Sequence, residues 1–314
     1  MREITPGIFI ETDHRGANYS GIVTDVGVIV IDTPIVPNQA RAFRDELRRV
    51  SGGKPFLYLI NTDHHRGHIL GNQYFQPTPV VAHELAWKHM KGYGDNFKQR
   101  VVDSFKKEPE VQAQLTDIQI IVPKVTFSHL LDIVRGGRDL RIIRIGGHTA
   151  ATSVVWVPDE KLLFVGDAVW VDQHPYMAQA NSKEWLDGLT FIRKLKADRI
   201  VPGRGPVCGR DATERMSEYI RFMRARVRTS YRQGKTKQET TPVVLREIAG
   251  WFPISPAIKS KTESQIKQGI GRIWNELEKA SRLKEKAAAE AEEEAYCVVR
   301  SCRPSIHRSA VFVH

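Results

Sequence analysis

The sequence predicts an α/β protein, and two observations support this prediction. Short apolar, β-branched runs alternate with turn residues and with stretches of helical spacing over the first two thirds of the 314 residues. Two segments also echo each other, because Asp25-Val26-Gly27 and Asp159-Glu160-Lys161 each lead into an apolar run, and these runs end at Asp32 and Asp167. We therefore expect two related β-rich halves, although no repeat of fixed period is visible.

Individual elements follow from spacing and turn residues. In the first half, the pattern predicts a hairpin over residues 21–31, a helix from Pro37 to Val50, a buried strand over 56–61, a strand over 80–82 and one helix from His83 to about Lys107. The second half predicts strands over 140–145, 153–157 and 162–165, a helix over 185–196 and a last strand over 199–201. These elements alternate as expected for an α/β protein.

The texture of the sequence changes near residue 211. Residues 211–232 and 263–294 are helical by composition, and the segment that joins them, 234–256, carries three prolines. The last residues, 297–314, show no periodicity. We predict a first domain over residues 1–210, a helical C-terminal extension over 211–290 and a disordered tail over 291–314.

Composition narrows the function classes. The net charge is +11, and residues 221–237 contribute seven positive charges without an acidic residue, which makes nucleic acid a partner to consider. Those arginines fall on several helix faces without interleaved aromatics, so a solvated or subunit-contacting helix is favoured and nucleic-acid binding is not expected. Three cysteines do not suggest a disulfide framework, and no leader or run of about 20 apolar residues occurs. We expect a cytoplasmic protein without a membrane segment; the oligomeric state cannot be predicted.

Polar residues of metal-ligand type follow several predicted strands. They are Asp32, the cluster Asp63-His64-His65-Arg66-Gly67-His68, His148, Asp167 and Arg204. In this order and spacing, together with the segments Gly147-His148-Thr149, Phe164-Val165-Gly166-Asp167 and Pro202-Gly203-Arg204-Gly205-Pro206, the chain resembles the metallo-β-lactamase superfamily from about Ile4 to Cys208. The resemblance implies a four-layer αββα sandwich and a metal-dependent hydrolase.

The resemblance also exposes departures from the family pattern. The family reads His-x-His-x-Asp-His where this chain has Asp63, His65, Gly67 and His68, so the first histidine is replaced by Asp63 and the aspartate by Gly67. His148 and Asp167 are kept, and Arg204 replaces a family histidine. These changes fall unequally on the two metal positions of the family.

The first metal position keeps a full set of ligand types. By the resemblance, Asp63, His65 and His148 would hold a metal ion with Asp167 as a fourth ligand, which suits a catalytic zinc with one open position. Two histidines and one carboxylate also suit non-haem iron(II), so iron remains an alternative. A further alternative is a polar loop whose side chains satisfy one another by hydrogen bonds.

The second metal position keeps only His68 and Asp167, because Gly67 and Arg204 replace two ligands. We hypothesise a mononuclear site, with a second ion weak or absent, in which Arg204 replaces the second metal and binds an anionic group of a small-molecule substrate. The alternative is that Arg204 forms a structural ion pair with Asp167.

The family chemistry then suggests roles for the remaining groups. A metal-bound water would attack an acyl-type substrate (β-lactam, lactone or thioester), Asp167 would position that water or accept its proton, and His68 would protonate the leaving group. His174 and Tyr176 follow Asp167 in a loop and are predicted to contact substrate. The alternatives are a non-catalytic binding or regulatory protein on a degenerate scaffold, an iron-dependent enzyme, or a phosphodiesterase on the same fold.

Overall fold

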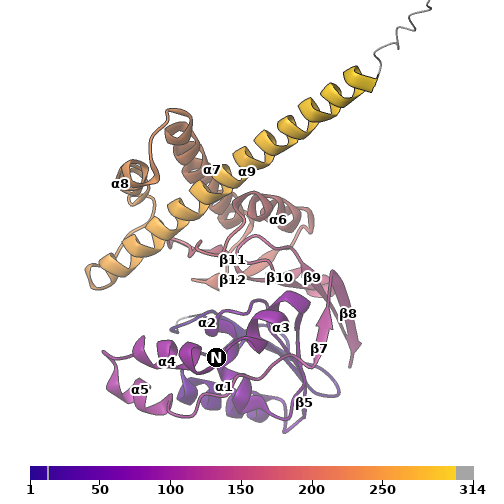
Figure 1. Cartoon of the computed structure of the whole chain (residues 1–314). Helices are drawn as coiled ribbons and strands as arrows, with labels where there is room; N and C mark the ends of the chain where they lie inside the picture. The colour runs from indigo at the N-terminus through magenta and orange to yellow at the C-terminus, as the bar shows by residue number, and fades with distance from the viewer. Residues whose placement is uncertain (13, 302–314) are drawn as a thin grey trace, which may run out of the picture.

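The computed structural model describes residues 1–12 and 14–301 and contains two β-sheets that pack face to face between layers of helices (Figure 1). This arrangement confirms the predicted α/β fold class and the αββα sandwich. Each sheet arises from one of the two β-rich halves of the sequence. The segments that follow the strands converge where the two sheets meet.

The first sheet has seven strands in the order of the chain, antiparallel from β1 to β4 and parallel from β4 to β7. The strands are β1 Arg2–Thr5, β2 Ile8–Glu11, β3 Tyr19–Val23, β4 Val28–Ile31, β5 Phe56–Ile60, β6 Val80–His83 and β7 Val125–Phe127. The predicted hairpin is β3–β4, and its turn is closed by hydrogen bonds of the Thr24 hydroxyl. Because β4 and β5 are parallel, Asp32 and the cluster after Asn61 lie at the same edge of the sheet.

The second sheet has five strands in the order β12-β11-β10-β9-β8. They are β8 Leu130–Arg135, β9 Arg138–Arg144, β10 Ser153–Val157, β11 Leu162–Trp170 and β12 Arg199–Arg204. Strand β11 is longer than the predicted 162–165, so Asp167 lies within the strand. Strands β11 and β12 are parallel, and Trp170 pairs with Arg204 at their carboxyl ends.

Helices flank the two sheets, and the longer ones cover the outer faces of the sheets (Figure 1). They are α1 Pro37–Val50, α2 Arg66–Ile69, α3 Glu84–Lys91, α4 Asp95–Asp103, α5 Pro109–Gln114, α6 Ser182–Lys194, α7 Arg210–Arg232, α8 Lys237–Ile248 and α9 Lys259–Ser301, with short 3-10 turns η1 Leu70–Phe75, η2 Pro158–Glu160 and η3 Pro256–Ile258. The predicted helix over 37–50 is confirmed. Helix α9 continues to Ser301, and the rest of the predicted tail, 302–314, lies outside the described residues.

Two helix predictions were wrong. The single helix predicted over 83–107 is broken after Lys91 into α3 and α4, because Gly92 and Gly94 weaken helix propagation at that point. The segment 234–256, predicted as a proline-rich connection, contains α8. Thr236 and Glu239 form a capping box that starts α8, and Pro242 is accommodated inside it.

Three apolar clusters hold the layers together. Ile29, Ile31 and Phe164 belong to the cluster between the two sheets, and Phe43 and Leu47 of α1 pack on the outer face of the first sheet. The largest cluster covers the outer face of the second sheet. It includes Trp185 of α6, Ile220 of α7, Val244 of α8 and Ile270 of α9. The C-terminal helices therefore share one core with the second sheet.

Among the described residues, no helix is long and apolar enough to cross a membrane. The predicted basic helix corresponds mainly to α7, and two of its arginines are paired with carboxylates of neighbouring helices. Arg224 pairs with Glu276 of α9, and Arg226 pairs with Glu247 of α8. These two arginines therefore serve helix packing.

Candidate metal centre

Ligand-type side chains from both sheets meet at the sheet junction. The Nδ1 atom of His65 lies 3.2 Å from Nε2 of His148, and that Nε2 lies 3.6 Å from Oδ2 of Asp167. One ligand atom from each of these three residues lies within 4.8 Å of the others. Zinc bonds of 2.0–2.2 Å place neighbouring ligand atoms about 3.3–3.6 Å apart, so this group fits a single metal ion.

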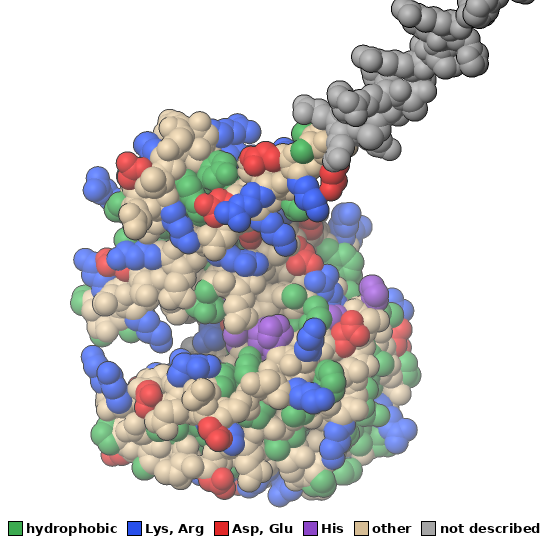
Figure 2. Space-filling view, in the orientation of Figure 1, with side chains coloured by type: hydrophobic (Ala, Val, Ile, Leu, Met, Phe, Trp, Pro, Cys, Tyr) green, Lys and Arg blue, Asp and Glu red, His purple; other side chains and the backbone are tan. Residues whose placement is uncertain are grey.

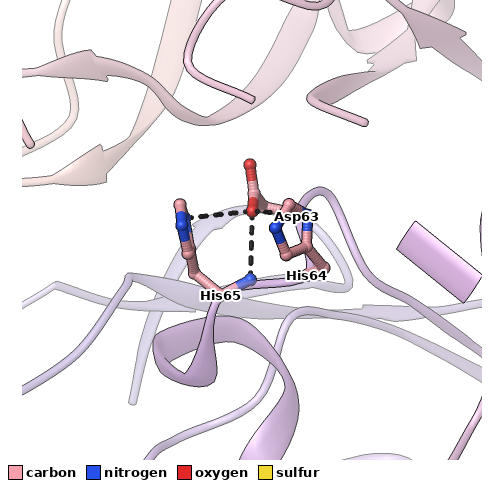
Figure 3. A group of neighbouring side chains, drawn as sticks. All are labelled: Asp63, His64 and His65. Carbon is pink, nitrogen blue, oxygen red and sulfur yellow. Dashed lines mark hydrogen bonds and ion pairs between the residues drawn. The ribbon is translucent and has the colours of Figure 1, made fainter. Parts of the chain in front are cut away.

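Asp63 lies beside this group. Its Oδ1 atom is 3.1 Å from Nδ1 of His65 and accepts a hydrogen bond from the backbone N–H of the same residue at 3.0 Å (Figure 3). Its Oδ2 accepts hydrogen bonds from the hydroxyls of Thr149 (2.9 Å) and Thr152 (3.0 Å). Within 4.8 Å, Asp63 groups with His64 and His65, and the His148 and Asp167 ligand atoms belong to the other group. The structure thus ties Asp63 to His65 more closely than to the rest of the predicted ligand set.

His64 and His89 are stacked on each other with ring centroids 4.2 Å apart. The Nε2 atom of His64 lies 3.0 Å from the side-chain oxygen of Gln179, and burial lowers the pKa of His64 to about 4. The Nδ1 atom of His64 lies 3.6 Å from Oδ1 of Asp63, so His64 belongs to the Asp63 group and not to the group of His148 and Asp167 (Figure 3).

Asp167 is held between two cations. Its Oδ1 accepts a hydrogen bond from Nε of Arg204 at 3.1 Å, its Oδ2 accepts one from Nη2 at 3.3 Å, and Nε2 of His68 lies 3.3 Å from Oδ2. Burial alone would raise the pKa of Asp167, but Arg204 and His68 hold it well below its usual range. Asp167 is therefore ionised and a weak base. A side chain at position 203 would exclude this carboxylate, because a Cβ on Gly203 would lie 2.3 Å from Oδ1.

His68 lies between two carboxylates and is fully buried. Its Nδ1 is 2.9 Å from Oδ2 of Asp32, and its Nε2 faces Asp167. Burial would lower the pKa of His68, but these two carboxylates outweigh it and raise the pKa to about 10. Asp32 adopts a left-handed backbone with φ of 55°, and Thr62 holds its carboxylate through a backbone N–H (2.8 Å) and a hydroxyl (2.6 Å).

His148 shows the opposite behaviour. Burial lowers its pKa to about 4, although Asp167 and Asp63 act in the other direction. The imidazole is therefore neutral at pH 7, which is the state that binds metals. Its Nδ1 is buried without a hydrogen-bond partner, as is Nε2 of His65, so the ring atoms that do not face each other are unsatisfied by the described protein atoms.

The guanidinium of Arg204 lies beside Gly67. A Cβ on Gly67 would lie 3.1 Å from Nη2 of Arg204, so the absent side chain at 67 provides the space for the guanidinium. Arg204 also donates a hydrogen bond to the carbonyl of Gly16 and lies over the ring of Trp170, 4.8 Å from its centroid. The ion pair with Asp167 that was the alternative for Arg204 is present.

The ligand group opens into a cavity of about 630 Å³ between the first sheet's loops and α9. Its wall includes His65, Asp167, Tyr176 and Arg204. Figure 2 shows this hollow between the two halves of the molecule, with Lys and Arg side chains on both sides of its opening. The aromatic ring of Tyr176 packs edge-on against His65 at 5.6 Å, so this predicted substrate contact does lie at the cavity.

His174 and His68 do not line the cavity. His174 is buried in the C-terminal helices, with Nδ1 3.1 Å from the Tyr219 hydroxyl and Nε2 3.3 Å from the Phe252 carbonyl. The arrangement gives no support to a substrate contact by His174, because both of its ring nitrogens have hydrogen-bond partners away from the cavity. It also gives none to proton donation by His68, whose ring nitrogens both face carboxylates.

Several cavity residues were missed by the sequence analysis. They are Arg15, Arg66, Tyr93, Arg100, Gln179 and Lys261. Arg66 follows His65 directly, and its position inside the histidine cluster was a usable signal. Lys261 belongs to α9 and is brought to the cavity only by tertiary packing.

A larger cavity, about 1170 Å³, lies between α8 and the first turns of α9. Its lining includes Leu245, Phe252 and Ile254, and Glu263 is the only carboxylate among its lining residues. No histidine lines it, so the candidate metal ligands lie at the smaller cavity.

Comparison with known proteins agrees with this geometry. The sequence model of the metallo-beta-lactamase superfamily matches residues 13–204, which is more than half of the chain. The chain belongs to the metallo-β-lactamase superfamily. The family match covers strands β3 to β12 and ends at Arg204, so β1 and β2 lie before it and α7, α8 and α9 lie beyond it.

Similar proteins extend this result. A beta-lactamase-like protein 2 homolog of Caenorhabditis elegans is 32% identical over 117 residues, which are 35% of this chain and 36% of that protein. A metallo-beta-lactamase from Pontibacter korlensis is 20% identical with a TM-score of 0.56 and covers 70% of this chain and 97% of its own. The sec-alkylsulfatase Pisa1 from Pseudomonas sp. is 15% identical with a TM-score of 0.65 and covers 87% of this chain and 49% of its own. The two structural likenesses show the metallo-β-lactamase fold.

Proposed function

We propose that the chain is a metal-dependent hydrolase with one metal ion, bound by His65, His148 and Asp167. The observation that carries the proposal is the convergence of two imidazole nitrogens and a carboxylate oxygen, with successive separations of 3.2 and 3.6 Å, at the wall of a cavity. Asp63 supports the site by fixing His65, and it is the nearest further carboxylate.

The same geometry supports one ion instead of two. Gly67 offers no ligand, and the space beside it holds the guanidinium of Arg204. His68 faces Asp32 and Asp167 with its two ring nitrogens, so in this proposal it is a buried cation and not a ligand. Two protein cations thus take the electrostatic place of a second metal ion.

Zinc is the metal that we propose. A bound zinc ion lowers the pKa of water to about 7 and polarises a carbonyl oxygen. The residues of the chain supply the surroundings: Asp167 stays ionised as a ligand between Arg204 and His68, and Tyr176 packs against His65 and faces the cavity. Iron(II) remains the second candidate, because two histidines and one carboxylate also bind it, and spectroscopy of anaerobically purified protein distinguishes the two metals.

The proposed substrates are acyl compounds: β-lactams, lactones or thioesters. A sulfate ester should be tested with these substrates. The alkylsulfatase resembles 87% of the present chain, which is more than the region matched by the family model. A phosphodiester completes the panel as the alternative on the same fold. The competing proposal is a non-catalytic binding protein, which the loss of second-metal ligands at Gly67 and Arg204 favours.

Metal analysis of the purified full chain, combined with this substrate panel, tests the proposal. We expect one zinc ion per chain and turnover of an acyl substrate. Two tightly held ions would contradict the mononuclear site, and a metal-free protein inert on the whole panel would favour the binding protein.

A matched pair of variants sharpens the count. Gly67→Asp together with Arg204→His restores two ligand types and should raise the metal content from one to two ions per chain. Gly67→Asp alone should not, because Arg204 would still occupy the space beside position 67. Equal metal contents of the double variant and the wild type would show that these two positions do not define the second site.

A further inference from the structure

The cavity wall carries far more positive than negative charge. Its cations are Arg15, Arg66, Arg100, Arg204 and Lys261, and its lining contains one carboxylate, that of Asp167. They come from separate parts of the chain: Arg66 begins α2, Arg100 belongs to α4, and Lys261 lies in the first turn of α9. The fold therefore gathers these cations around one space.

Among the side chains that the structure describes, carboxylates pair with two of these cations. Arg204 pairs with Asp167, and Arg15 pairs with Glu108. Arg66 donates a hydrogen bond of 2.7 Å to the Ser104 hydroxyl, a neutral partner. Among the side chains of residues 1–12 and 14–291, no carboxylate lies within 4 Å of the charged atoms of Arg66, Arg100 or Lys261.

The positive charges of the cavity wall act on Lys261. Burial lowers the pKa of Lys261, and the charges of Arg15, Arg66 and Arg204 lower it further. Arg100 and Lys261 are exposed at the cavity and Arg66 is half-buried. Like charges that face one space repel one another, and an anion bound among them would offset that repulsion. Ser264, Gln265 and Gln268 stand on the same face of α9 and add neutral hydrogen-bonding groups to the wall.

We infer that Arg66, Arg100 and Lys261 form an anion subsite that holds a phosphate-type, multiply charged group of the substrate, apart from the bond that is cleaved. The inference rests on the proposed function and deepens it by naming a substrate class: a small molecule with a hydrolysable acyl bond at one end and a phosphate-bearing arm at the other. A volume of about 630 Å³ lies within the range of small-molecule sites, which favours such a substrate over a polymer.

The subsite also changes the role of Arg204. Its Nε and Nη2 atoms donate to Asp167, and its Nη1 atom donates to the Gly16 carbonyl. The anchor of the substrate anion is therefore assigned to the cations without carboxylate partners. Helix α9, which lies outside the region of the family match, thereby becomes part of the substrate site.

Calorimetric titration with inorganic pyrophosphate, at fixed ionic strength and on the full chain with its metal, tests the subsite. Lys261→Ala and Arg100→Ala should each raise Kd by about tenfold or more, because each removes a charged donor that would hydrogen-bond to the anion. Lys259→Ala is the matched control, since Lys259 lies two residues away on α9 and lines the other cavity. Its Kd should stay within about twofold of the wild-type value.

Three further results complete the test. Lys261→Arg, which keeps the charge, should retain pyrophosphate binding, and Lys261→Gln provides an uncharged variant of similar length if the alanine variant does not fold. An unchanged Kd in Lys261→Ala and Lys261→Gln, or an equal loss in Lys259→Ala, overturns the subsite. Tighter binding of a single-stranded oligonucleotide than of pyrophosphate, also dependent on Lys261, overturns the small-molecule assignment.

The subsite and the proposed function fail in different experiments. His148→Ala removes a proposed metal ligand and leaves the cations in place, so it should lose metal and turnover yet bind pyrophosphate with a Kd close to that of the wild type. A protein with metal and turnover whose pyrophosphate binding does not depend on Lys261 rejects the subsite alone. A metal-free, inert protein that binds pyrophosphate through Lys261 rejects the hydrolase and keeps the subsite.

Discussion

The two metal positions of the family lie on either side of Asp167, and in this chain they carry opposite chemistry. On one side, His148 is a neutral imidazole, because burial lowers its pKa to about 4. On the other side, His68 is a cation, because Asp32 and Asp167 overcome the effect of burial and raise its pKa to about 10. Two buried histidines of one site thus differ in charge because carboxylates lie 2.9 and 3.3 Å from the ring nitrogens of His68, whereas Asp167 lies 3.6 Å from His148 and the neighbouring histidines lower its pKa further.

This difference separates two properties that a metal ion combines. A metal ion balances the charge of Asp167 and also accepts electron pairs from its ligands. Arg204 and His68 can balance the charge of Asp167, but their cationic nitrogen atoms have no vacant orbital that could accept an electron pair. In the proposed mononuclear site, the second position would therefore supply positive charge but no Lewis acid.

The largest effect should come from the cation side. His68→Asn leaves Asp32 and Asp167 buried without the charge between them, and breaking such a pair costs about 3–5 kcal/mol of unfolding free energy. Urea denaturation in the presence of a chelator measures this loss without a contribution from metal binding. His129→Asn, at an exposed histidine, should change the free energy of unfolding by less than about 0.5 kcal/mol.

A companion variant checks the cause. Adding Asp32→Asn to His68→Asn removes one of the two uncompensated charges, so the double variant should lose less stability than the sum of the single losses. A strictly additive result would show that the ion pair is not what stabilises this side.

The neutral side should respond in metal affinity. His148→Ala removes an imidazole ligand and should weaken metal binding by more than about 100-fold, which is the upper limit expected for residues that only support a ligand. Metal analysis and competition with a chelator measure the change. If His148→Ala retained its metal while His129→Ala behaved identically, the ligand group would be assigned incorrectly.

Arg204 lies on the cation side and is partly exposed, so its effect should be smaller than that of His68. Arg204→Met should cost about 2 kcal/mol of unfolding free energy, the contribution of hydrogen bonds to a charged group. Arg210→Met, which removes an exposed pair with Glu214, should cost below about 0.5 kcal/mol. Equal losses in the two variants would argue that Asp167 does not depend on Arg204.

The smallest effect is expected for the threonine hydroxyls that hold the carboxylate of Asp63. Thr149→Val removes one of the two hydroxyls that donate to Oδ2, and Thr152 keeps the other. Metal affinity should fall by about tenfold, the lower end for a residue behind a ligand. Thr190→Val, an exposed threonine on α6 whose hydroxyl bonds only to its own helix, is the control. No change in Thr149→Val would indicate that Asp63 plays no part in holding the metal.

Much of the fold could be predicted because its signals are local. The hairpin β3–β4 follows from two β-branched runs around a turn, and α1 from helical spacing after Pro37. Some local signals were misjudged. The segment with Pro242 was predicted as a connection, although Thr236 and Glu239 have the spacing of a capping box and indicate the start of α8. The break at Gly92, which places Tyr93 at the cavity, was likewise overlooked.

The site was predictable where its residues follow strands. His65, His148 and Asp167 were expected together and do lie together. The roles of the individual groups were not predictable, because they depend on distances between distant segments. Asp32 contacts His68 across 36 positions and makes it a cation, and Lys261 reaches the cavity through the packing of α9 on the second sheet.

The apolar cluster that joins the second sheet to α6, α7, α8 and α9 determines which part of the chain can fold independently. A chain cut near residue 210 would lose Ile220, Val244 and Ile270, which cover Trp185 and the sheet beneath it. The segment matched by the family and the C-terminal helices should therefore unfold together, in one cooperative transition. Limited proteolysis would then cut α9 within residues 283–291, whose side chains are exposed, and leave its first turns, with Lys261, within the folded unit.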